Sequence, residues 1–327
     1  MKPLPPDLMQ SFTAFQESRI LLTAVELDVF TAVGRGARAG EVAAEIHADP
    51  RATEMLLNAL VALGMLSKRT GVFRNTTAGA EFLVEGAPSA SRQALLHTVH
   101  LWDRWSNLTA SVRAGTATGH RKIEKRGEPW IEAFIAAMHR RAEATAPALV
   151  KAIGAGKLAR VLDVGGGSGV YSIAFAQANP RLEALVLDLK PVLAIARRHI
   201  EAAGLEGRVK VRAGDLRKDT LGAGYDLVFI SAICHMLGPD ENLDLFRRCF
   251  DALAPGGRIV VKDFILEKDK TAPAWAAVFS LNMLVGTERG SDYSKQEYVA
   301  WLKQAGFVAV RYLAVPGIAD LMVGRKR

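Results

Sequence analysis

The stretch VLDVGGGSGVYS, residues 161–172, decides how the second half of this chain is interpreted. Its glycines fall at positions 165, 166, 167 and 169. Glycine has no Cβ, so its backbone can adopt positive φ angles and lie close to a ligand. A helical pattern follows the glycines, and the first N–H groups of a helix have no partner within the helix, so they can bind a ligand. A dinucleotide-binding G-x-G-x-x-G turn would need a third glycine where Val170 stands, so the spacing favours a cofactor without a pyrophosphate.

Strand-like and helical segments alternate from Arg160 onward. The predicted strands are residues 160–164, 184–187, 209–213, 225–230 and 258–264. The predicted helices are residues 172–178, 191–203, 241–253 and 294–305. This alternation is typical of a parallel sheet with helices on both faces. The fold class is therefore α/β, with a Rossmann-like sheet.

Two acids follow successive strands of this predicted sheet. Asp188 lies 19 residues beyond Gly169, where a carboxylate can accept hydrogen bonds from both hydroxyls of a ribose. Asp215 ends the next strand and is placed to receive an adenine amino group. Either acid alone could simply cap the helix that follows it. Glycines, acid and acid on three consecutive strands instead predict a nucleoside site at the carboxyl edge of the sheet.

The first 90 or so residues predict short helices closed by a hairpin, which is the winged-helix order. Leu21 to Phe30 give an apolar helical face, helices follow at residues 40–47 and 50–66, and residues 67–76 read as two strands around Gly71. A helix that reads DNA presents polar side chains to base edges, whereas EMLLNALVALGML, residues 54–66, is apolar on nearly all sides. The apolar segments 19–33 and 54–66 instead predict burial or a homodimer.

Composition narrows the classes of protein further. The chain has 327 residues, net charge +8 and only two cysteines, Cys234 and Cys249, without CxxC spacing. Two cysteines in this spacing predict neither a zinc site nor a disulfide framework. They are typical of a reducing compartment, so we expect a cytoplasmic location. The basic residues are scattered, so no nucleic-acid partner is predicted. No apolar run reaches the ~18 residues of a membrane span, so no membrane partner is predicted either.

Residues 161–264 resemble class I S-adenosylmethionine (SAM) dependent methyltransferases, through VLDVGGGSG, LDL, GD and the Ala254–Gly257 turn. Over about residues 15–327 the chain resembles the small-molecule O-methyltransferase family of caffeate-type and bacterial tailoring enzymes, which carry an N-terminal winged-helix dimerisation domain. The resemblance implies SAM as cofactor and S-adenosylhomocysteine as product. The expected cofactor-binding residues are Asp163, Gly165, Gly167, Asp188, Asp215, Leu216 and Ser231.

The resemblance also implies a catalytic histidine. His235 lies in ICH just beyond the fourth strand, where the family has ICHDW and uses the histidine as general base. Met236 and Leu237 replace the family's acid and tryptophan. Asp292 is the expected orienting carboxylate, with Glu288 as an alternative. The second family acid is expected near the C-terminus, where Asp320 is offset and hydrophobic residues surround it, so the acid pair looks incomplete.

The substrate pocket is expected above the carboxyl edge of the sheet. Its predicted walls are the aromatic and methionine side chains of Trp102, Trp105, Phe134, Met138, Phe279 and Met283, with Trp275 beside them. The predicted sections are residues 1–95 for dimerisation, 96–153 as a helical linker and 154–327 for SAM binding.

The predicted function is methyl transfer to a hydroxyl of an aromatic or polyketide-like molecule, without a metal. Carbon or nitrogen methylation, a non-methylating use of SAM and a SAM-sensing DNA-binding regulator remain alternatives. A nicotinamide oxidoreductase is disfavoured by Val170.

Overall fold

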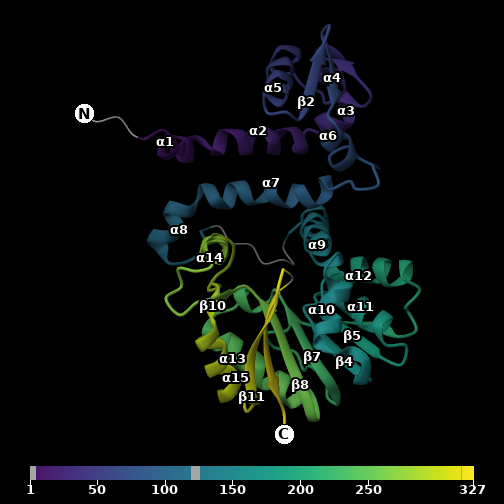
Figure 1. Ribbon diagram of the computed structural model, residues 1–327, viewed down its shortest axis with the longest axis vertical. Coiled ribbons are helices and arrows are strands. Elements are labelled where there is room, and N and C mark those ends of the chain that lie inside the picture. The colour runs from purple at the N-terminus through teal and green to yellow at the C-terminus, as the bar shows by residue number, and fades with distance from the viewer. Residues whose placement is uncertain (1–4, 119–125, 318) are drawn as a thin grey trace. The chain divides into compact units, whose positions relative to one another are not determined.

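The computed structural model describes residues 5–118, 126–317 and 319–327. Their contacts divide the chain into two compact units, residues 1–102 and residues 103–327 (Figure 1). The predicted linker of residues 96–153 is thereby shared between the two units. Each unit is described by itself.

The first unit is mainly helical and contains one small sheet. Its helices are α1 (Pro6–Thr13), α2 (Phe15–Glu26), α3 (Val29–Val33), α4 (Ala39–Glu45), α5 (Pro50–Ala62), α6 (Thr77–Phe82) and most of α7 (Arg92–Ser106). The strands β1 (Ala37–Arg38), β2 (Leu66–Arg69) and β3 (Val72–Asn75) form an antiparallel sheet in the order β1-β3-β2. The predicted hairpin around Gly71 is confirmed, and Gly71 has a φ of 77°.

Two predictions for this unit need correction. The helix predicted at 50–66 ends at Ala62, because Leu66 already begins β2. The helical face from Leu21 to Phe30 is broken at Asp28, whose left-handed φ of 57° separates α2 from α3. The apolar residues of segments 19–33 and 54–66 mostly pack inside the unit, although Leu27 and Met55 stay exposed. Four more exposed apolar side chains, Leu8, Met9, Phe12 and Phe15, lie earlier, on α1 and α2.

The second unit alternates strands and helices. Its strands are β4 (Arg160–Val164), β5 (Glu183–Asp188), β6 (Val209–Ala213), β7 (Tyr225–Ser231), β8 (Leu253–Asp263), β9 (Ile265–Leu266), β10 (Tyr293–Ser294), β11 (Val308–Val315) and β12 (Ala319–Arg325). Its helices are α8 (Leu108–Ala114), α9 (Glu128–Glu143), α10 (Ala146–Ile153), α11 (Val170–Ala178), α12 (Lys190–Ala202), α13 (Pro239–Ala252), α14 (Ala274–Gly286) and α15 (Lys295–Gln304), with short 3-10 turns at Ala155–Lys157 and Cys234–Met236.

Seven strands form the main sheet, in the order β11-β12-β8-β7-β4-β5-β6. The five predicted strands are the parallel ones, from β8 to β6. The strands β11 and β12 were not predicted, and they join antiparallel at the edge beside β8. The predicted α/β sheet is therefore confirmed and is extended by a C-terminal hairpin.

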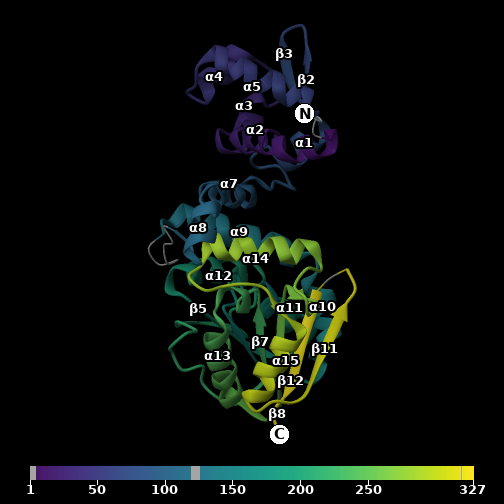
Figure 2. The same ribbon diagram turned by 90° about the vertical axis from the view of Figure 1, so that its left-hand side faces the viewer.

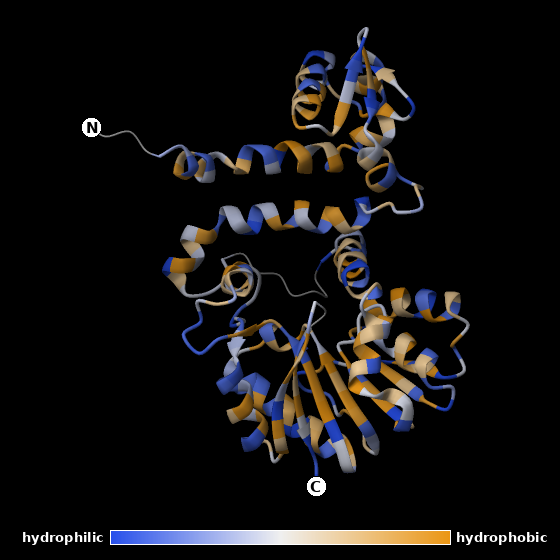
Figure 3. Cartoon of the chain, viewed as in Figure 1, coloured by the Kyte–Doolittle hydropathy of each residue, from blue (hydrophilic) through white to orange (hydrophobic). Residues whose placement is uncertain are grey.

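Helices cover both faces of this sheet (Figures 1 and 2). One hydrophobic core joins α10, α11 and α12 to the sheet, and a second core joins α13 and α15 to the opposite face. The central strands are accordingly hydrophobic along most of their length (Figure 3). Both views place α9 and α14 beyond the carboxyl ends of the parallel strands. The functional residues described below lie at this edge.

Candidate active site

The glycine-rich turn brings its backbone close to two apolar side chains. Gly165, Gly167 and Gly169 have φ angles of 68°, 57° and 76°, which favour glycine. A Cβ on Gly165 would lie 2.4 Å from Cδ1 of Ile233 and 3.5 Å from Cδ2 of Leu216. A side chain at this position would clash with Ile233, so the turn needs glycine here, and α11 begins directly after the turn, at Val170.

Asp163 lies beneath this turn. It is buried, and its Oδ2 accepts a hydrogen bond of 2.8 Å from Ser172 Oγ. Its Oδ1 has no hydrogen-bond partner among the described residues. Burial raises the pKa of Asp163 to about 7, and the hydrogen bond from Ser172 opposes this rise. A buried acceptor without a donor is costly, so Asp163 can accept a hydrogen bond from a bound group.

Asp188 connects the second strand to the turn. Its Oδ2 accepts 2.8 Å from the Gly167 N–H, and its Oδ1 accepts 2.7 Å from the Leu189 N–H. Burial raises its pKa to about 6, while these two backbone bonds lower it. A carboxylate offers about four lone-pair positions, so acceptor capacity remains for the two hydroxyls of a ribose.

The other predicted cofactor residues lie at the ends of β6 and β7. Asp215 Oδ1 accepts 2.9 Å from the Arg217 N–H, so this acid does cap its own turn. Leu216 lies over Gly165, as noted above, and Ser231 lies beside the Tyr171 hydroxyl. The fold thus brings the predicted cofactor residues to neighbouring strand ends at one edge of the sheet.

His235 forms the second half of this edge, on the turn after β7. The side chain is buried, and its Nδ1 lies 2.5 Å from Oδ1 of Asp263. Asp263 also accepts hydrogen bonds from the His235 and Phe264 N–H groups and from the Tyr298 hydroxyl. A carboxylate at Nδ1 fixes the tautomer that leaves Nε2 as the basic nitrogen. Burial alone would raise the pKa of Asp263, but His235 and these hydrogen bonds hold it below its ordinary value.

Asp292 lies beside this pair, on the loop between α14 and β10. Ligand atoms of His235, Asp263 and Asp292 all lie within 4.8 Å of one another. Asp292 is buried, and neither of its carboxylate oxygens has a hydrogen-bond partner among the residues that the structure describes. Burial raises its pKa to about 7; a positive charge on His235 opposes this rise, and the charge of Asp263 adds to it.

Asp263, which the sequence analysis did not single out, lies at Nδ1 of His235, whereas no hydrogen bond joins Asp292 to the imidazole. Asp263 is the second-last residue of the strand predicted at residues 258–264, so the carboxyl-edge rule that selected Asp188 could have found it. Asp320 accepts a hydrogen bond from Tyr312 instead and is not part of the cluster, and Glu288 is exposed. The cluster also offers the donors of a cation site, but the short Nδ1–Asp263 contact favours an oriented base.

Aromatic rings surround the imidazole. Phe264 stacks on His235 with 5.5 Å between ring centroids, and Phe279 meets its edge at 5.1 Å. Trp275 contacts Phe264 at 4.9 Å and is itself 53% exposed. Phe264 is nearly perpendicular to both Phe279 and Trp275, so the three rings make an angled apolar wall next to the histidine, which suits an aromatic ligand.

The remaining predicted wall residues are distributed more widely. Met283 follows Phe279 on α14, and Trp105 Nε1 donates 3.0 Å to Asn282 on the same helix. Phe134 stacks on Trp130 within a small cluster on α9, the helix that also carries Met138. Trp102 belongs to the first unit, where Arg19 lies over its ring.

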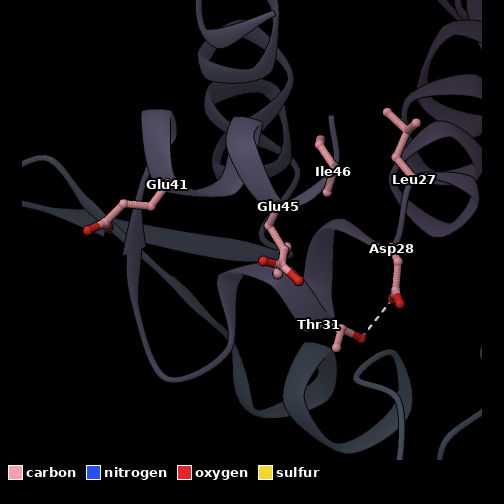
Figure 4. A pocket seen from close by; sticks show the side chains of 7 residues that line it. Leu27, Asp28, Thr31, Glu41, Glu45 and Ile46 are labelled. Atoms are coloured by element: carbon pink, nitrogen blue, oxygen red, sulfur yellow. Dashed lines mark hydrogen bonds between the residues drawn. The ribbon is translucent and has the colours of Figure 1, made fainter. Parts of the chain in front are cut away.

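A separate hollow of about 340 Å³ lies within the first unit (Figure 4). Leu27, Ile46, Glu41 and Glu45 contribute to its lining, and Asp28 in its wall accepts a hydrogen bond from Thr31. It holds neither glycine-rich turn nor histidine, so it carries none of the chemistry above. Across the described part of the chain, no helix combines the length and apolarity that a membrane crossing requires.

Comparison with known proteins places this geometry in a family. Residues 105–308 match the O-methyltransferase domain, and residues 9–85 match the O-methyltransferase dimerisation domain. The chain is 33% identical to 3-hydroxy-5-methyl-1-naphthoate 3-O-methyltransferase of Streptomyces sahachiroi, over 98% of this chain and 95% of that protein. It is 30% identical to L-tyrosine C(3)-methyltransferase of Streptomyces lavendulae, over 90% of this chain and 84% of that protein. The solved structure of PigF with SAH is similar, with 28% identity, a TM-score of 0.91 and coverage of 99% and 100%.

The α/β sheet and the glycine-rich turn after β4 are those of a SAM-dependent methyltransferase. The chain belongs to the O-methyltransferase family with an N-terminal dimerisation domain. The residues present fit the cofactor, because Asp163 Oδ1 has no partner among the described residues and Asp188 keeps free acceptor capacity.

Proposed function

We propose that this enzyme transfers a methyl group from SAM to a hydroxyl of a small aromatic molecule, with His235 as general base. The observation that carries the proposal is the buried His235–Asp263 contact of 2.5 Å beside the wall of Phe264 and Phe279. The naphthoate-modifying relative supports an aromatic acceptor.

Each residue of the cluster has a distinct task in this proposal. SAM supplies an electrophilic methyl group on a positively charged sulfur when it is bound. His235 Nε2 removes the hydroxyl proton of the acceptor as the new oxygen–carbon bond forms, and Asp263 stabilises the imidazolium that results. Asp292 lies next to the same imidazole, and its ionised carboxylate can stabilise the positive charge of the imidazolium. The aromatic wall aligns the acceptor ring, which makes the reaction effectively unimolecular.

The cofactor half has matching tasks. We assign the ribose hydroxyls to Asp188, the adenine side to Asp215 and Leu216, and the amino-acid end to the backbone at Gly165 and Gly167. Asp163 supports the turn from below through Ser172, and Ser231 lies at the neighbouring strand end. Binding of S-adenosylhomocysteine, measured by calorimetry, tests this half independently of any acceptor.

Carbon methylation is the second candidate, because a relative at 30% identity is named a C-methyltransferase. Matched acceptors separate the two reactions. A naphthol and its methyl ether present the same ring, but only the naphthol has a free hydroxyl. Radiolabelled SAM should label the naphthol and leave the ether unlabelled, whereas label on both acceptors would favour transfer to carbon.

The first unit supports a homodimer in this proposal. Four apolar side chains of α1 and α2 are strongly exposed: Leu8 at 42%, Met9 at 46%, Phe12 at 66% and Phe15 at 56%. Exposed apolar rows of this kind mark protein interfaces. Light scattering should find a dimer at micromolar concentration, and the double variant Phe12→Ser, Phe15→Ser should weaken it. Val112→Ser, an equally exposed apolar position on α8, is the control.

We assign no nucleic-acid partner to this unit. Helix α5, which would be the reading helix of a winged-helix regulator, packs Leu57 and Leu60 into the core. A SAM-sensing regulator would shift DNA in a mobility assay at moderate salt, and this protein should not.

A further inference from the structure

Arg104, near the end of α7, is a cation that no carboxylate of the described residues pairs with. Its side chain is half-buried, and its guanidinium lies 5.1 Å from the centroid of the Trp130 ring. Among the residues that the structure describes, none gives this guanidinium a hydrogen bond or an ion pair. A guanidinium carries five N–H donors, and burying them without acceptors is unfavourable.

A second guanidinium lies over the same ring. Arg126 is 4.3 Å from the Trp130 centroid. Burial, and then the positive charge of Arg126, lowers the pKa of Arg104 to about 10, so Arg104 stays charged at neutral pH. Two like charges over one aromatic ring repel each other, and an anion bound at Arg104 would offset this repulsion.

Helix α14 connects this charge to the base. Phe279, Met283 and Gly286 follow each other at spacings of four and three, so they lie on one face of the helix. Phe279 contacts the edge of His235, and a Cβ on Gly286 would lie 3.1 Å from Nη1 of Arg104. Seven residues of α-helix span about 10 Å, so the base and the guanidinium flank an apolar face of roughly that length.

This arrangement is anchored on both sides. Trp105, the neighbour of Arg104, donates its 3.0 Å hydrogen bond to Asn282, which fixes the end of α7 on α14. The absence of a side chain at Gly286 leaves the guanidinium room beside the helix.

Resting on the proposed function, we infer that Arg104 binds a carboxylate on the methyl acceptor, so that the enzyme selects flat aromatic hydroxy acids. The acid and the hydroxyl lie at opposite ends of a ring system about as long as a fused bicycle. The planar guanidinium can bind a carboxylate through two parallel hydrogen bonds, while the rings lie along Phe279 and Met283.

The test is calorimetric binding to the full chain saturated with S-adenosylhomocysteine. The ligands are a hydroxynaphthoate with its two groups on opposite rings, and the naphthol that lacks the carboxylate. The parent should bind the hydroxynaphthoate roughly 10- to 100-fold more tightly, the usual effect of a charge-assisted hydrogen bond. Arg104→Gln should abolish this preference without changing naphthol affinity, and Arg104→Lys should keep part of it.

Arg113→Gln is the matched control, because it removes one positive charge from an exposed position on α8. It should keep the full preference. If Arg104→Gln no longer binds S-adenosylhomocysteine, Gly286→Ala replaces it, since the added methyl crowds Nη1 and should weaken only the hydroxynaphthoate. Equal affinity of the parent for both ligands, no binding of either, or an equal loss in the control would overturn the inference.

The same ligands separate this inference from the proposed function. A carboxylate preference without methyl transfer to the hydroxyl would keep the Arg104 site and reject the assigned reaction. Methyl transfer to the naphthol without a carboxylate preference would keep the assigned reaction and reject the Arg104 site.

Discussion

The two halves of the sheet edge are built in different ways. In the cofactor half, Asp188 accepts hydrogen bonds from Gly167 and from its own neighbour Leu189, so adjacent strand ends hold the site together. In the base half, His235, Asp263 and Asp292 come from three separate segments within a 58-residue stretch. The first is a local motif, whereas the second exists only after folding. Binding and chemistry should therefore respond to different substitutions.

The largest effect is expected at His235. Replacing it with alanine removes the proton acceptor and should lower the single-turnover rate by roughly 10²–10⁴, the usual contribution of a positioned base. Affinity for S-adenosylhomocysteine should stay nearly unchanged, because no cofactor contact is assigned to this residue. A rate within about threefold of the parent would make the histidine structural, with catalysis resting on proximity.

Asp188→Ala should weaken cofactor binding in the other half of the sheet edge. It removes the proposed charge-assisted bonds to the ribose and the acceptor that holds the Gly167 N–H, so cofactor binding should weaken by about 2–3 kcal/mol. Calorimetric titration with S-adenosylhomocysteine measures this loss. Asp226→Ala, at a strand start on the opposite edge where it accepts from the Ala159 and Arg160 N–H groups, is the control. Unchanged affinity in Asp188→Ala would show that the site is misassigned.

Asp263→Asn tests which carboxylate of the base half supports His235. The amide cannot stabilise an imidazolium as a carboxylate does, so the rate should fall about 10- to 100-fold while the ring remains. Asp292→Asn should cost less, because Asp292 makes no hydrogen bond to His235 in this structure. Single-turnover rates of both variants on one acceptor give the ranking, and the reverse order would return the orienting role to Asp292.

The smallest effect concerns stability and pH. The pKa of Asp292 is raised to about 7, above its ordinary 3.8, so the folded state binds the extra proton. Its contribution is favourable at low pH and declines as pH rises from about 4 to about 7. Asp292→Asn should thus gain about 1–2 kcal/mol relative to the parent between pH 5 and pH 7.5 in denaturant unfolding. A difference that does not vary with pH would contradict the raised pKa.

Sequence reasoning reached the cofactor half because strand ends obey a simple rule. Glycine spacing, Asp188 and Asp215 predicted the sheet and the edge to which we assign the nucleoside. Asp263 was not among the predicted site residues, because it lies within the strand-like run IVVKDFIL, residues 259–266. Its strand-end position could have suggested it, and its register next to β7, which pairs Ser231 with Lys262, shows that it reaches His235.

The C-terminal hairpin shows another limit. Residues 308–315, VAVRYLAV, alternate in burial along much of β11, yet they follow the last predicted helix and pair only with residues near the chain's end. The aromatic walls were predicted by residue type, but their places depend on how α8, α9 and α14 pack. Local pattern therefore predicts elements and strand-end residues, whereas contacts among distant segments need the fold.

The rate of a single turnover, measured across SAM concentrations up to saturation, tests the separation of binding and chemistry most directly. With Asp188→Ala, the rate should climb back to within a few fold of the parent once SAM saturates the weakened site, because the base is intact. With His235→Ala, the rate should stay roughly 10²–10⁴ below the parent at every SAM concentration. A His235→Ala enzyme restored by excess SAM, or an Asp188→Ala enzyme that saturates yet stays equally slow, would contradict the account.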